Sequence, residues 1–173
     1  MRMSTDRFGD LTRPFARGIY DLLRALDDPP LQLNKHQSAR VREAVSVSIR
    51  KVCDVLVPDA RHPEVSVAAA ERAAELGVNL WVQTWQTQTK FDPGRSVFHY
   101  EHMRPIAAIR NALGSATSPD EVIETIRRDL RLAWITKEEN LRLTSLGYNS
   151  VRPDPDAAYA EAGIVLMPRE ADE

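Results

Sequence analysis

Apolar residues recur every three or four positions along most of the first half of the chain, which is the period of an α-helix. One such stripe lies in residues 10–28 and a second in residues 34–58, where Pro58 ends the pattern. A third helix is predicted over residues 62–77, because a proline lies near its first turn and Gly77 follows its last. These stripes predict a helical N-terminal part.

The pattern changes after residue 90, where apolar and polar residues begin to alternate. In residues 95–103, Val97, His99 and Glu101 would face one side of a strand, with Phe98, Tyr100 and His102 on the other. A second short strand is predicted at residues 131–136, in the apolar run LAWIT. Between the two strands, residues 104–115 and 118–130 have the pattern of two helices.

A further helix is predicted from Thr136 to Gly147, since Thr136 and Glu139 have the spacing of a capping box. A short helix and an acidic tail complete the chain. The predicted fold class is therefore α+β and mostly α: a helical N-terminal half followed by a small two-stranded ββα-like unit with a helical insertion. We expect one domain over residues 1–173, with a helical part (1–90), a ββα-like part (91–150) and a helix with an acidic tail (151–173).

Composition narrows the class of protein. With 43% hydrophobic and 28% charged residues and a net charge of −2, the chain of 173 residues is typical of a globular domain. Its one cysteine, Cys53, excludes an internal disulfide and a cysteine-rich zinc site, and we expect it in the core. No apolar run reaches the length of a membrane span, and the first ten residues lack the apolar core of a signal peptide, so we expect a cytoplasmic protein without a membrane partner.

Candidate chemistry is concentrated in the stretch FHYEHMRPI, which holds two of the four histidines and a glutamate. One interpretation is a strand whose polar side chains form local hydrogen bonds. A zinc site from His99 and His102 is disfavoured, because residues three apart in a strand face opposite sides. A third interpretation is a metal-free acid–base site made by Glu101 and a histidine, whose imidazole titrates near neutrality.

A fourth interpretation uses more of the chain. The residues Glu101-His102-x-x-Pro105, placed at a strand end, resemble the first half of the HNH endonuclease motif, and the phrase ENLRLTSL resembles its second half around Asn140. Asn149 stands nine positions beyond, where the family has another residue of its metal site. The resemblance covers about residues 95–150 and implies a ββα unit around one divalent metal.

The resemblance implies cleavage of phosphodiester bonds in nucleic acid, with DNA favoured, and a divalent metal, Mg²⁺ or Mn²⁺, as cofactor. His102 would be the general base and Asn140 would orient it. Glu101 would bind the metal, together with Asn149 or Glu139, since carboxylate and amide oxygens suit a hard ion.

Two arginines are candidates for binding substrate phosphate. Arg104 follows the predicted general base, and Arg95 follows the turn FDPG. The three tryptophans, Trp81, Trp85 and Trp134, could stack on bases, but their spacing and apolar neighbours favour core positions.

A different class of function is also compatible with the sequence. The first 90 residues carry no catalytic pattern, and the C-terminal tail is acidic, which would suit a basic partner. This alternative is a non-catalytic helical partner-binding protein, such as an antitoxin or a small regulator. The two interpretations differ in a geometric expectation: for an HNH site, the two strands must pair and the helix from Thr136 must bring Asn140 to His102.

Overall fold

A computed structural model describes residues 6–168 of the chain and divides it into two compact units. One unit contains Met1–Leu56 and Ile106–Leu130, and the other contains Val57–Pro105 and Arg131–Glu173. The predicted helical insertion between the strands therefore belongs with the N-terminal helices. None of the helices between residues 6 and 168 is long and apolar enough to cross a lipid bilayer.

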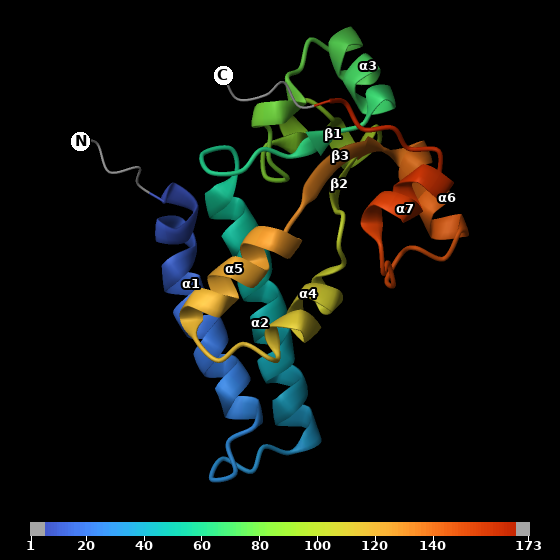
Figure 1. The fold of residues 1–173 in the computed structure, drawn as a ribbon. Coiled ribbons are helices and arrows are strands. Elements are labelled where there is room, and N and C mark those ends of the chain that lie inside the picture. The colour runs from blue at the N-terminus through green and yellow to red at the C-terminus, as the bar shows by residue number, and fades with distance from the viewer. Residues whose placement is uncertain (1–5, 169–173) are drawn as a thin grey trace, which may run out of the picture. The chain divides into compact units, whose positions relative to one another are not determined.

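The first unit consists of four helices (Figure 1): α1 (Arg7–Leu26), α2 (Lys35–Leu56), α4 (Ile106–Leu113) and α5 (Pro119–Asp129). Helix α1 lies against α2 and α5, and α2 lies against α4. Each helix turns its apolar stripe inward, and the buried side chains include Ile19, Val45, Ile49, Cys53, Ile109 and Ile126. The predicted helices and the buried position of Cys53 are confirmed.

The ends of these helices are fixed by short-range polar contacts. Asp6 caps α1 by accepting a hydrogen bond of 3.1 Å from the Gly9 N–H, and Ser118 caps α5 in the same way. The Asp6 carboxylate also pairs with Arg127 of α5 at 2.7 Å. The guanidinium of Arg127 lies 4.4 Å from the centre of the Phe8 ring, so one arginine joins α1 to α5.

The second unit is built on a three-stranded sheet with the order β1-β3-β2. Strand β2 (Phe98–His102) pairs antiparallel with β3 (Leu132–Thr136), as predicted, and β1 (Glu64–Val65) pairs parallel with β3. The sequence predicted two strands and missed β1, because this strand has two residues and leads at once into a helix. Ser66 caps that helix, α3 (Val67–Glu75), which is short and rich in alanine.

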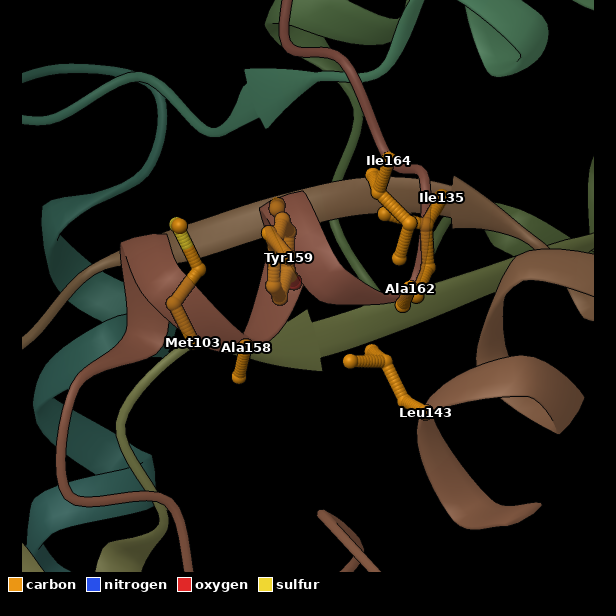
Figure 2. Packing of buried hydrophobic residues seen from close by; sticks show 8 residues of the cluster. Met103, Ile135, Leu143, Ala158, Tyr159, Ala162 and Ile164 are labelled. Atoms are coloured by element: carbon orange, nitrogen blue, oxygen red, sulfur yellow. The ribbon is translucent and has the colours of Figure 1, made fainter. Parts of the chain in front are cut away.

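The two faces of the sheet carry separate clusters of buried side chains. On one face, here the Trp134 face, Trp134 packs with Val65, Ala69, Ala73, Leu80 and Phe98. On the other, here the Tyr159 face, Ala133 and Ile135 pack with Met103, Leu143, Ala158, Tyr159, Ala162 and Ile164 (Figure 2). Helices α6 (Lys137–Ser145) and α7 (Pro155–Glu161) supply Leu143 and Tyr159, so both helices cover the Tyr159 face.

Three single-turn helices connect α3 to β2: η1 (Leu80–Val82), η2 (Gln88–Lys90) and η3 (Pro93–Arg95). Asp92, which is 1% exposed, organises the entry into β2. Its carboxylate accepts hydrogen bonds from the backbone N–H groups of Ser96 (2.9 Å), Val97 (3.1 Å) and Phe98 (3.0 Å). The Gln88 amide donates a fourth, at 3.0 Å, so a single side chain satisfies the polar groups of the turn.

Replacing Asp92 with alanine should lower the free energy of unfolding by about 2–4 kcal/mol, because buried N–H groups would lose their acceptor. Urea denaturation followed by circular dichroism measures this loss. Asp21→Ala, at an exposed position of α1, is the control and should change stability by less than about 0.5 kcal/mol. Equal stabilities of the two variants would show that the turn does not depend on Asp92.

Candidate functional site

The strand β2 separates the two residues at the centre of the HNH resemblance. Glu101 lies opposite Ala133, and His102 lies opposite Leu132. Successive side chains of a strand point to opposite faces, so Glu101 and His99 are on the Tyr159 face and His102 is on the Trp134 face. Glu101 and His102 therefore do not converge on one ion. The strand alternation that disfavoured a zinc site from His99 and His102 excludes a shared site for this pair for the same reason.

Asn140 is also on the other side of the sheet from His102. It lies in the first turn of α6, and α6 packs on the Tyr159 face through Leu143. The N-cap of this helix, Thr136, pairs with Phe98 of β2. Phe98 lies four residues, or about 13 Å, along β2 from His102. The predicted strand pairing is present, but the fold-back that would bring Asn140 to His102 is not.

The other predicted metal ligands have different surroundings. Glu139, 2% exposed, accepts hydrogen bonds from the Thr136 N–H at 2.8 Å and from the Ser66 hydroxyl at 2.6 Å. It closes the predicted capping box and ties α6 to the start of α3. Asn149 is exposed in the turn after α6. Glu139 thus has a structural role, and the capping-box spacing predicts its contact with Thr136.

The structure instead assembles a buried polar cluster around Glu101, which comprises His99, Glu101 and Arg152. One carboxylate oxygen of Glu101, Oε2, lies 2.9 Å from Nε2 of His99, and the other, Oε1, lies 2.7 Å from Nη1 of Arg152. The side chains of Arg152 and Glu101 are 2% and 11% exposed, whereas that of His99 is 32% exposed. The imidazole is therefore the part of the cluster that solvent and a ligand can reach.

Arg152 is held by backbone oxygens on both sides of the cluster. Its Nη1 donates to the Met103 oxygen and its Nη2 to the Tyr148 oxygen, both at 2.8 Å. The guanidinium also lies 5.7 Å from the centre of the Tyr159 ring, which is labelled in the hydrophobic cluster of Figure 2. These contacts connect the end of β2 with the loop after α6, so Arg152 fixes Glu101 and joins two segments that are distant in sequence.

The charges of this cluster follow from its contacts. Burial by itself would raise the pKa of Glu101, but the hydrogen bond from His99 and the charge of Arg152 outweigh it and hold that pKa below its ordinary value. Burial, followed by the nearby Glu101 charge, raises the pKa of Tyr159 well above its ordinary value. At neutral pH, Glu101 is ionised and Tyr159 is neutral.

The lowered pKa values of Glu101 and Asp92 predict a loss of stability in acid. Both carboxyls have folded-state pKa values below their ordinary 4.5 and 3.8, so their contribution is complete above those values. It is lost as the pH falls through the folded-state pKa values. Urea midpoints measured from pH 7 down to pH 2 should decline below about pH 4.5, and Asp92→Asn should make the decline less steep. A constant midpoint through this range would contradict the assignment.

The divalent metal predicted from the resemblance does not fit the surroundings of these residues. Among residues 6–168, no group of three or more His, Cys, Asp or Glu side chains is arranged to hold a metal ion. Both oxygens of Glu101 are occupied by Arg152 and His99, which compete with a cation. The arrangement suits proton transfer at His99 better than metal binding at Glu101.

The two arginines predicted to bind substrate lie in loops of the sheet unit. Arg104 is partly buried in the bend after β2. Arg95 ends η3 and stacks on Trp85. Comparison with protein-family models, with curated proteins and with solved structures finds no match to this chain.

Sequence reasoning missed Arg152 and left open which histidine pairs with Glu101. The i, i+2 spacing of His99 and Glu101 places both side chains on one face of a strand, and this signal was available from the alternation alone. Arg152 gave no comparable signal, because it stands 51 positions from Glu101 at the start of a predicted helix. Only the packing of α7 on the sheet brings it to the carboxylate.

Proposed function

We propose that the chain cleaves phosphodiester bonds in RNA, with His99 as the general base and Glu101 as its positioning residue. The observation that carries this proposal is the 2.9 Å contact between His99 Nε2 and a buried, ionised Glu101. A carboxylate next to imidazole fixes the ring and selects the tautomer with the proton on the bonded nitrogen. Nucleic acid as the substrate is what the sequence resemblance of residues 95–150 to the HNH nucleases implies. The structure separates the residues of that motif, so the geometry supports the acid–base pair alone.

The chemistry follows from this tautomer. Because the Nε2–H group donates a hydrogen bond to the Glu101 carboxylate, Nδ1 carries the free lone pair, which accepts the proton of a ribose 2′-hydroxyl. The 2′ oxygen then bonds to phosphorus, and the bond from phosphorus to the 5′ oxygen breaks. The products are a 2′,3′-cyclic phosphate and a 5′-hydroxyl, whose proton comes from solvent. DNA lacks the 2′-hydroxyl, and this route therefore selects RNA.

The proposal is tested with end-labelled RNA and DNA strands of one sequence, each incubated with Mg²⁺ and with a chelator. The expected result is cleavage of RNA in both conditions, with a cyclic phosphate end, and intact DNA. Cleavage of either strand only with Mg²⁺ would favour the metal-dependent HNH mechanism at His102. Intact strands in all conditions would contradict both nuclease mechanisms and favour the alternative of a non-catalytic partner-binding protein.

A further inference from the structure

Trp85 differs from the other tryptophans in its exposure. Trp134 is fully buried, whereas Trp85 is 49% exposed, so the predicted core position of Trp85 is wrong. The guanidinium carbon of Arg95 lies 3.9 Å from the centre of the Trp85 ring. This distance is that of a stacked cation–π pair, which we call the Trp85–Arg95 pair.

The backbone of Arg95 is in an unfavourable conformation. Its φ of 52° lies in the left-handed region, and Gly94 before it has a φ of 73°. A non-glycine residue at such a position is strained, whereas glycine or asparagine adopts it more readily. An arginine at this position thus opposes stability, which is typical of residues placed for binding.

The charge of Arg95 is not neutralised by the residues that the structure describes. Between residues 6 and 168 it has no ion pair, and its hydrogen bond is a long one, from Nη2 to the Trp85 oxygen at 3.4 Å. Lys90, at the end of η2, is exposed and adds a second positive charge. Asp92 is the one acid of the segment from residue 80 to residue 96, and its carboxylate is buried and accepts hydrogen bonds from backbone N–H groups. The surface of the segment is therefore positive beside an open indole.

We infer that the Trp85–Arg95 pair binds single-stranded nucleic acid. A base stacks on the exposed part of the Trp85 indole, and the adjacent phosphate binds the Arg95 guanidinium. Aromatic rings next to unpaired cations are the usual means of binding single strands, because every base has a flat face and every linkage a negative charge. The substrate class rests on the proposed function, but the binding does not depend on His99.

The test is the fluorescence anisotropy of a labelled dT12 strand titrated with the protein, since DNA is not cleaved by the proposed route. The wild-type protein should bind, and more weakly as salt is added. Trp85→Ala and Arg95→Asn should each weaken binding about tenfold or more. Arg72→Ala removes an exposed positive charge on α3, where Arg72 pairs with Glu75, and should bind within about twofold of wild type. No binding by wild type, or equal binding by all four proteins, would overturn the inference.

Thermal unfolding of the same variants distinguishes binding from a structural role. Arg95→Asn and Arg95→Gly should be at least as stable as wild type while losing affinity, because the left-handed backbone suits both residues. A clear loss of stability in both variants would overturn the inference. Binding of dT12 without cleavage of RNA would refute the proposed function and leave this inference intact. Cleavage of RNA with undiminished binding by Trp85→Ala would refute the inference alone.

Discussion

Replacing Arg152 with alanine is expected to lower the free energy of unfolding by about 3–5 kcal/mol. The side chain is 2% exposed, and the change leaves the buried carboxylate of Glu101 without its positive partner. It also removes the donors to the oxygens of Met103 and Tyr148, so the end of β2 and the loop after α6 lose their connection. Urea denaturation at pH 7 measures the loss.

Two further variants separate the charge of Arg152 from its packing. The double variant Glu101→Leu with Arg152→Met should be more stable than Arg152→Ala, since it leaves no buried charge unpaired. Arg40→Ala removes an arginine whose side chain is 67% exposed and whose partner Glu43 is 58% exposed, and it should cost about 1 kcal/mol or less. A similarly small loss in Arg152→Ala would mean that the buried pair with Glu101 does not hold the sheet unit together.

Replacing His99 with alanine is expected to slow RNA cleavage about 10²- to 10⁴-fold, the usual contribution of a general base. The fold should remain, because His99 is partly exposed and Arg152 still neutralises Glu101. Single-turnover cleavage rates measure the effect, and far-UV circular dichroism checks the fold. His36→Ala, at an exposed position in α2, is the matched control and should leave the rate unchanged. A His99→Ala protein that cleaves at the wild-type rate would remove His99 from the mechanism.

The features that could be predicted from the sequence are those fixed by neighbouring residues. The capping pairs Asn34 with Gln37 and Thr136 with Glu139 both form, because their partners are three residues apart. The alternation in residues 95–103 predicted β2, and the apolar run in residues 131–136 predicted β3. The two predicted strands together implied that they pair with each other. The fold class followed from this order of elements, and the structure confirms it as mostly α with a small sheet.

The features that could not be predicted depend on contacts between distant segments. Strand β1 exists because Glu64 and Val65 pair with β3, and two residues carry no periodic pattern. Arg152 reaches Glu101 only because α7 packs on the Tyr159 face. Trp85 stands four positions after Trp81, which predicts a shared helical face, but η1 ends at Val82 and Trp85 is exposed. The position of Asn140 likewise depended on which face α6 covers, which is set by Leu143.

The central claim is that Glu101 serves His99 and not His102, and one comparison tests it most directly. The cleavage rates of His99→Ala and His102→Ala are measured side by side on the same RNA, once with Mg²⁺ and once with a chelator. The proposed mechanism predicts that His99→Ala cleaves about 10²- to 10⁴-fold more slowly than wild type in both conditions and that His102→Ala retains a rate close to wild type. An inactive His102→Ala protein beside an active His99→Ala protein would contradict it and return the catalytic role to His102.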